Sequence, residues 1–438
     1  MEAGKRFFLI LCVLSLIDST NYAFFIPIMP DFLISQGISL SLIGVILSFF
    51  QIGSLCCSLY LSKYLLYQSK KNLLIMGQIL LILANFGFAT ISPDFPIEAI
   101  IFLALALRFI QGVAFCLIFS ISNYNLTVLY PQNLDKYYAT FEIWRGIGYS
   151  LGPVIGGLIY EFMSYSWCFI IIAVFYSIMS LLLFPKILKY QAEMEAEIEN
   201  SSPFLKRPIT SFKILKNKDF LLTFFVFIFS FMCYCVIQPK FSQHIHDYTD
   251  LEYAVGLVFG VGDFTYAMSG FLVIHIIMRL NFTRKNLFIM GGSLSMASLL
   301  LLGPEEYTFL PKSLVTIIIG MIVLGFSQMI YIPILIPEIC EIMKKNDQSS
   351  KGKKEMACCL FSFALALTQI FGSIIGGVLG DKFGFERGMA IYAVVLFGYL
   401  GFFAVFSKQK ENYKEKINEN EKKSEIESLL ILEKSEAN

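Results

Sequence analysis

Twelve long apolar runs dominate the sequence, and each is long enough to cross a lipid bilayer as a helix. The first covers residues 7–32 and the last 387–407, whereas a helical span needs about 20 mostly apolar residues. Hydrophobic residues make up 56% of the 438 residues and charged residues only 15%, so a soluble fold would lack polar surface. The sequence therefore predicts an all-α membrane protein with twelve transmembrane helices.

The basic residues predict which side of the membrane each end faces. With the N-terminus in the cytosol, the segments on that side hold 28 of the 34 Lys and Arg residues, and the opposite side holds four. Cytoplasmic loops of membrane proteins carry such an excess of Lys and Arg. We therefore expect both termini to be cytosolic.

Two stretches of the first half recur in the second half. KKNLLIMG, from Lys70, recurs as RKNLFIMG from Arg284, and GPVIGGLIYE, from Gly152, recurs as GSIIGGVLGD from Gly372. The offsets of 214 and 220 residues are similar, so the elements follow the same order in both halves. Parallel repeats of this kind place a substrate site between the halves, near the membrane midplane.

The repeat divides the chain into four parts. We predict two pseudo-symmetric six-helix bundles at residues 1–185 and 219–407. A charged cytosolic linker at 186–218 joins them, and a charged tail at 408–438, with one apolar patch, is expected to be disordered.

Short motifs in two predicted spans resemble those of the major facilitator superfamily. Arg108, Gln111 and Gly112 match its R-x-x-Q-G motif in the fourth span. The fifth span matches the G-P-x-x-G-G motif of the antiporter branch at five residues: Gly148, Gly152, Pro153, Gly156 and Gly157. The resemblance implies a major facilitator fold and transport by alternating access. Small residues allow close helix packing, so these glycines would let the halves rock without opening a leak.

The first span narrows the resemblance to the vesicular amine transporters. IDSTNYAFFIPIMP, from Ile17 to Pro30, places an Asp nine residues before a P-I-x-P, as in that group. Tyr266, in the glycine-rich run 256–270 of the eighth span, stands where that group has a substrate-facing tyrosine. The resemblance implies an amine or polyamine substrate that is exchanged for protons.

Two positions depart from that group. Gln238 stands where the group has a Glu before a proline, and Gln328 stands where it has an Asp five residues before a proline. Asp263 is an additional acid in the eighth span. We hypothesise that Asp263 supplies the negative charge that the two glutamines no longer provide. The alternative is that Asp263 caps backbone loosened by the neighbouring glycines.

Asp18 is the central residue of the predicted substrate and proton site. It lies near the middle of the first span, where an ionisable side chain is unfavourable and tends to face a cavity or a partner. It would act as the counter-ion of a cationic substrate or as a proton carrier; the alternative is a structural hydrogen bond to a neighbouring helix. The predicted site contains six residues: Asp18, Asn21, Gln238, Asp263, Tyr266 and Gln328.

Three charged residues of the fourth and fifth spans form a predicted charge network. Glu142 and Arg145 are three residues apart, so they share a helix face and can pair. The resemblance links Arg108, in the fourth span, to proton transfer. The alternative is an ion-pair network that only holds the two spans together.

No catalytic, metal or cofactor site is indicated. The ten cysteines include no CxxC pair, no Cys/His cluster has metal-binding spacing, and no nucleophile–base arrangement or phosphate-binding loop is present. We predict no enzyme activity, no cofactor and no nucleic-acid partner, and we expect a functional monomer in the bilayer.

The tail contains an acidic dileucine pattern, with Glu425 four residues before Leu429 and Leu430. This pattern resembles a sorting signal for endosomes, lysosomes or vacuoles. It favours a vesicular, lysosomal or vacuolar membrane over the plasma membrane.

The sequence thus favours a secondary transporter that exchanges a small organic cation for protons. In this mechanism Asp18, together with Asp263, holds either the substrate's charge or a proton. Two alternatives stay open. An uncoupled facilitator for a neutral or anionic solute would suit Arg108 and the two glutamines, and a receptor-like protein would keep the fold without transport.

Overall fold

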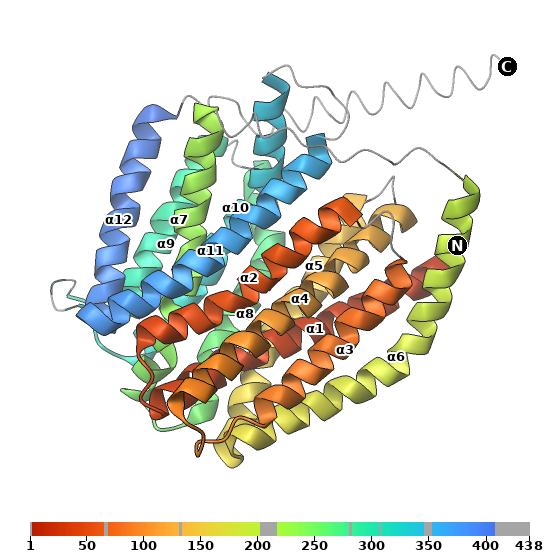
Figure 1. Cartoon of the computed structure of the whole chain (residues 1–438). Coiled ribbons are helices and arrows are strands. Elements are labelled where there is room, and N and C mark those ends of the chain that lie inside the picture. Colours follow the sequence, from red (N-terminus) through yellow and green to blue (C-terminus); the bar gives the residue numbers. More distant parts are fainter. Residues whose placement is uncertain are drawn as a thin grey trace.

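Twelve α-helices form the described part of the chain (Figure 1). The structure is a computed structural model that describes residues 2–64, 69–130, 134–201, 217–279, 283–305, 307, 309–345 and 353–407. The helices are α1 (Glu2–Ser35), α2 (Leu40–Tyr64), α3 (Lys70–Ala89), α4 (Ile97–Leu129), α5 (Leu134–Phe162), α6 (Tyr165–Ser201), α7 (Lys218–His246), α8 (Glu252–Arg279), α9 (Arg284–Leu302), α10 (Leu314–Lys345), α11 (Lys353–Phe383) and α12 (Phe385–Phe406).

The predicted all-α membrane fold is confirmed. Within the described residues, ten helices are long and apolar enough to cross a membrane, and only α5 and α8 fall outside this group. α5 carries the charged residues Glu142 and Arg145, and α8 carries Asp263. The two helices contact each other closely, which places part of their polar surface inside the protein. The chain is a multi-pass membrane protein.

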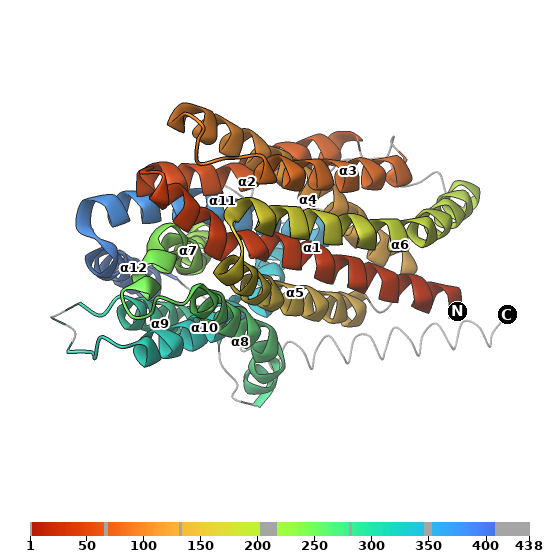
Figure 2. The ribbon, with the colours of Figure 1, turned by 90° about the horizontal axis from the view of Figure 1, so that it is seen from below.

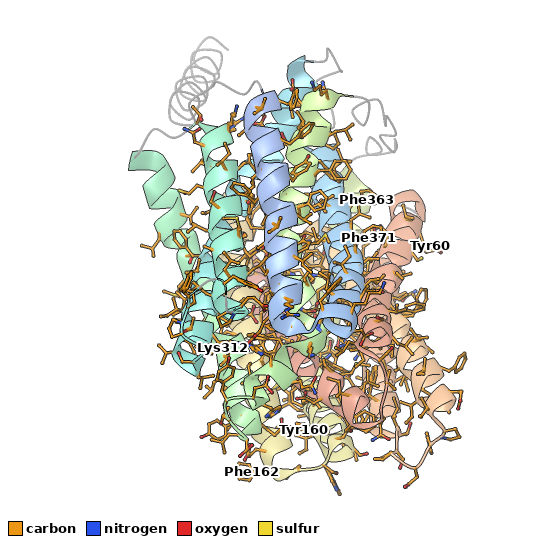
Figure 3. All side chains as sticks on the ribbon, turned by 90° about the vertical axis from the view of Figure 1, so that its left-hand side faces the viewer. Tyr60, Tyr160, Phe162, Lys312, Phe363 and Phe371 are labelled. Atoms are coloured by element: carbon orange, nitrogen blue, oxygen red, sulfur yellow. The ribbon has the colours of Figure 1, made fainter. Side chains whose placement is uncertain are left out.

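Large apolar side chains cover the outer surface of the helices. Phe162 is 81% exposed and Phe371 51%, and both point away from the ribbon, as do Tyr60 and Phe363 (Figure 3). Soluble monomers rarely expose continuous apolar surface on this scale. This apolar outer surface therefore contacts the lipid chains of the bilayer.

The two bundles, α1–α6 and α7–α12, meet on one side of the molecule. We call the side on which α1 begins and α12 ends the terminal side, and the opposite side the far side. The bundles meet at the far side and diverge toward the terminal side (Figure 1). Two helix pairs carry most of this junction, α2 with α11 and α5 with α8 (Figure 2).

Repeat-related glycines lie at equivalent places in this junction. Gly157 of α5 faces α8, where a Cβ atom would lie 2.9 Å from the carbonyl oxygen of Glu252. Gly377 of α11 faces α2, where a Cβ atom would lie 2.2 Å from the carbonyl oxygen of Leu40. Only glycine permits such close approach of two helix backbones.

The other residues of the glycine motif join α5 to both of its neighbours. A Cβ atom on Gly148, Gly152 or Gly156 would lie 2.4–2.9 Å from a backbone carbonyl of α1, in the same bundle. The carbonyl of Pro153 faces α8, 2.2 Å from the Cβ position of Gly256. The motif therefore serves packing within the first bundle as well as contact between the bundles.

The segment predicted as a linker begins as a helix. α6 continues to Ser201, through a stretch rich in Ala, Glu and Met, which are strong helix formers. Residues 202–216 and 408–438 lie outside the described residues. The predicted sorting signal at Glu425, Leu429 and Leu430 is among them.

Candidate functional site

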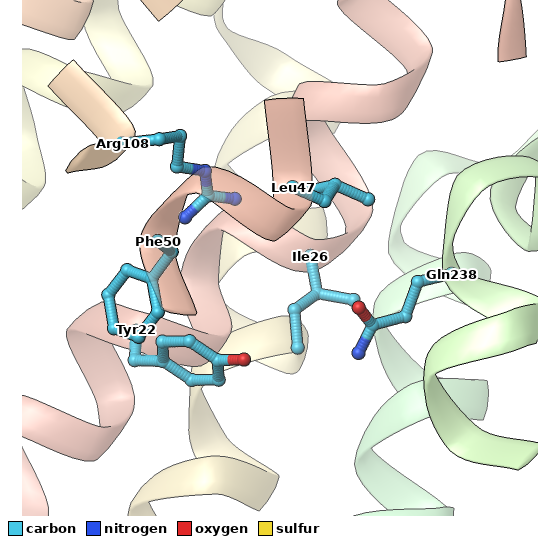
Figure 4. A pocket seen from close by; sticks show the side chains of 6 residues that line it. All are labelled: Tyr22, Ile26, Leu47, Phe50, Arg108 and Gln238. Carbon is cyan, nitrogen blue, oxygen red and sulfur yellow. The ribbon is translucent and has the colours of Figure 1, made fainter. Parts of the chain in front are cut away.

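A cavity lies where α1, α2 and α4 of the first bundle face α7 of the second (Figure 4). Its volume is about 320 Å³, which includes space open to solvent. Six residues line it: Tyr22, Ile26, Leu47, Phe50, Arg108 and Gln238. We call it the central cavity. The polar ends of Arg108 and Gln238 enter it from different bundles, so a bound molecule can contact both.

Arg108 is a buried cation with neutral neighbours. It is 3% exposed, and its Nη1 donates to Oε1 of Gln111 at 3.3 Å. Its guanidinium lies 4.6 Å from the ring centre of Phe25, and its Nε has no hydrogen-bond partner. No carboxylate of the described residues forms an ion pair with it. Because a buried unpaired charge is unfavourable, Arg108 favours an anionic or hydrogen-bond-accepting group in the central cavity.

A chain of buried amides holds Arg108 in place. Nε2 of Gln111 donates to Oδ1 of Asn85 at 3.0 Å, and Nδ2 of Asn85 donates to Oδ1 of Asn21 at 2.8 Å. Asn21 and Asn85 are 2% and 0% exposed. The structure therefore places Asn21, predicted to bind substrate, behind the cavity wall as part of this support.

Replacing Asn85 with leucine is expected to destabilise the protein. The change leaves Asn21 Oδ1 and Gln111 Nε2 buried without partners, at about 1–3 kcal/mol for each group. The midpoint of thermal unfolding in detergent should fall by several degrees. Asn72→Leu, at an exposed position of the same helix, is the control and should unfold like wild type. Equal midpoints for the two variants would contradict a stabilising amide chain.

A second cavity, of about 230 Å³, contains Asp18. Asp18 precedes Tyr22 by one helical turn of α1, so this cavity lies on the terminal side of the central one. Residues of α1, α4 and α5 line it: Ser15, Asp18, Ser19, Phe115, Phe119, Ser122, Phe141 and Arg145. We call it the Asp18 cavity.

Asp18 is a buried carboxylate held by a neutral donor. It is 5% exposed and accepts a hydrogen bond from the Tyr176 hydroxyl of α6. No basic nitrogen of the described residues lies within the 4 Å of an ion pair. A carboxylate in this position needs a proton or a cationic group nearby to offset its burial.

The predicted charge network is split between the two cavities. Nη1 of Arg145 pairs with Oε1 of Glu142 at 2.6 Å, and Nη2 donates to the Tyr149 hydroxyl at 2.7 Å. The Arg145 guanidinium lies 4.3 Å from the ring centre of Phe119, which connects α5 to α4. Arg108 belongs to the central cavity, away from this pair.

The remaining predicted site residues come from the second bundle. Asp263 accepts a hydrogen bond from the Tyr234 hydroxyl at 3.2 Å and is half-buried, as is Tyr266. Gln328 is 4% exposed, and its Nε2 donates to the carbonyl of Ser230 at 2.9 Å. This bond holds α10 to α7. Of the two glutamines, only Gln238 lines the central cavity.

Two acidic residues close the far side. Asp381 of α11 accepts hydrogen bonds from the backbone N–H groups of Leu40 (3.0 Å) and Ser41 (2.7 Å) at the start of α2. Glu161 of α5 accepts one from the N–H of Glu252 (2.6 Å) at the start of α8. Helix N-termini bind anions through their free N–H groups and dipole. We call these two contacts the acid caps.

The sequence analysis did not identify the acid caps, although the repeat contained the signal for them. GPVIGGLIYE ends in Glu161 and GSIIGGVLGD ends in Asp381, so the acids occupy the same repeat position. Their partners, the starts of α2 and α8, are also equivalent elements of the two halves. Position alone did not show that each acid contacts the opposite bundle.

Comparison with known proteins identifies the family. A family model described as Major Facilitator Superfamily matches residues 11–350. The MFS-type transporters SLC18B1 of Mus musculus and Homo sapiens are each 25% identical, over 85% and 84% of this chain and 79% of theirs. Among solved structures, the nucleoside transporter NupG superposes with a TM-score of 0.71 at 15% identity, covering 92% of this chain and 100% of that one. A D-xylose-proton symporter gives 0.68 at 17%, covering 90% and 96%.

Proposed function

The chain belongs to the major facilitator superfamily, and on this premise we propose that it exchanges a small organic cation for protons by alternating access. The family and the named relatives are transporters, so the prediction that the chain is no enzyme is confirmed. A small-molecule substrate and a lipid environment follow from the family. The exchanged ions, the substrate class and action as a monomer belong to the proposal.

The distribution of basic residues supports a cytosolic terminal side. It holds 28 of the 34 Lys and Arg residues, which the positive-inside rule assigns to the cytosol. The far side then faces the lumen of a vesicle, lysosome or vacuole, as the dileucine pattern of the tail favours. In this orientation the lumenal side is closed and the bundles diverge toward the cytosol.

The surroundings of Asp18 are the observation that most strongly supports exchange of a cation for protons. Its buried carboxylate has a neutral donor and lines a cavity together with Arg145, but no basic nitrogen of the described residues lies within ion-pair distance of it. Arg145 is paired with Glu142, so a proton and a substrate ammonium group are the species that can neutralise Asp18 directly, and each excludes the other. Competition for one carboxylate couples the two movements in opposite directions.

A second candidate function rests on the central cavity. Arg108 and Gln238 line it, whereas none of its six lining residues is acidic. This chemistry suits a neutral or anionic solute that moves without protons. A zwitterionic substrate, with one positive and one negative group, would contact Arg108 and Asp18 together, because their cavities are adjacent along α1 and α4.

Uptake into proteoliposomes with an imposed pH gradient tests the proposal. Labelled monoamines and polyamines should accumulate in response to the gradient, and Asp18→Asn, which can neither titrate nor carry charge, should abolish accumulation. Asp250→Asn, at an exposed loop position, is the control and should transport like wild type. Uptake of an anionic or neutral solute that ignores the gradient would favour the second candidate. Loss of all flux with retained ligand binding would indicate a receptor-like protein.

A further inference from the structure

Three side chains with metal-binding atoms meet at the far-side junction. Nε2 of His246, at the end of α7, lies 3.3 Å from Oε2 of Glu252 in α8 and 3.6 Å from Oδ2 of Asp31 in α1. One ligand atom of each residue lies within 4.8 Å of the other two. We propose that Asp31, His246 and Glu252 bind Zn²⁺ and that the ion holds the far side closed.

The hydrogen bond of His246 Nδ1 fixes the ring so that Nε2 is the nitrogen available to a metal ion. Nδ1 lies 3.2 Å from the carbonyl oxygen of Thr249. Because a carbonyl oxygen only accepts, Nδ1 carries the proton of this bond. Nε2 faces the carboxylates of Asp31 and Glu252, and when the ring is neutral its lone pair points toward them, an arrangement that a cation between the three groups stabilises. Metal-binding histidines typically donate their other N–H to a backbone carbonyl in this way.

The two separations from Nε2 suit a bound metal ion, and they also lie within the range of an imidazolium–carboxylate ion pair. Zinc bonds of about 2.0–2.2 Å in a tetrahedral site place neighbouring ligand atoms roughly 3.3–3.5 Å apart. One imidazole and two carboxylates also suit Zn²⁺ better than Ca²⁺ or Mg²⁺, which prefer oxygen ligands alone.

The cluster is accessible and connects the bundles. The side chains of Asp31, His246 and Glu252 are 13%, 26% and 31% exposed, so an ion can reach them from the far side. Asp31 belongs to the first bundle and the other two to the second. An ion bound by all three stabilises the state in which the bundles touch, by mass action. Zinc on the far side would therefore slow transport.

Zinc-dependent thermal unfolding of the purified full-length protein tests this inference. The affinity tag must contain no histidine or cysteine. Micromolar Zn²⁺ should raise the unfolding midpoint of the wild type, and His246→Gln or Glu252→Gln should weaken zinc affinity at least tenfold. His244→Gln is the matched control: His244 lies two residues away, stacks on Phe385, and should leave the zinc shift unchanged.

Zinc K-edge absorption separates this site from the ten cysteines of the chain. The inference requires a shell of nitrogen and oxygen at about 2.0–2.1 Å, without sulfur near 2.3 Å. A wild type without a zinc shift, a sulfur shell, or an equal shift in both variants would overturn it. These measurements need no transport activity, so their outcome is independent of the proposed function.

Discussion

Valine in place of Gly377 is expected to keep the far side open and to reduce exchange by roughly a hundredfold or more. The added Cβ atom would lie 2.2 Å from the carbonyl oxygen of Leu40 and 2.9 Å from Cα of Ser41. Both atoms belong to the α2 backbone, so no side chain can move aside. α11 must separate from α2, and the protein loses the state that returns the site to the terminal side.

Two other glycine substitutions separate this effect from misfolding. Gly377 faces the opposite bundle, so its own bundle should still fold. Gly376 faces Val236 of α7 within the same bundle, with 2.1 Å from its Cβ position to that carbonyl, and Gly376→Val should reduce the yield of folded protein. Gly401→Val, on α12 with nothing within 4 Å, should behave like wild type.

Proteoliposome exchange and a distance across the far side are the two readouts for Gly377→Val. Spin labels at residues 94 and 250, both in exposed loops of the far side, report separation of the bundles. Labels attached through unnatural amino acids avoid the native cysteines. An exchange rate within threefold of wild type, or an unchanged distance, would show that the junction tolerates a Cβ atom.

The fold was predictable because lipid imposes simple rules. A helix that crosses a bilayer needs a long apolar run. The twelve apolar runs, of which the first begins at residue 7 and the last ends at residue 407, indicated each of the twelve described helices. The similar offsets of the two repeated stretches, 214 and 220 residues, indicated two bundles. The extension of α6 to Ser201 was missed, because hydropathy shows where a helix leaves lipid and not where it ends.

The site was less predictable, because its contacts join residues far apart in the chain. Asp18 stood out as an acid in an apolar run, but its partner Tyr176 is 158 residues away in an ordinary apolar stretch. Asn21 and Gln328 were predicted as ligand-binding amides, and in the structure both bond to other helices. A polar residue in a span indicates a partner, and the sequence does not tell whether that partner is substrate or protein.

Removing both acid caps is expected to shift the protein away from the far-side-closed state. Asp381→Asn and Glu161→Gln each remove a carboxylate from a helix N-terminus, where its charge and hydrogen bonds contribute about 1–2 kcal/mol. The caps lie on different helix pairs, so their effects should add. The double variant should therefore lower the ratio of closed to open protein by roughly thirtyfold or more, since about 1.4 kcal/mol changes an equilibrium tenfold.

The far-side label distance again provides the measurement. The single variants should lengthen it partially and the double variant most, because either cap alone still ties one helix pair. Glu98→Gln is the matched control: it removes an exposed acid from the first turn of α4, within one bundle, and should leave the distance unchanged. A double variant with the wild-type distance would assign the closure to the glycine contacts of Gly157 and Gly377 instead. The caps would then serve only to satisfy the first N–H groups of α2 and α8.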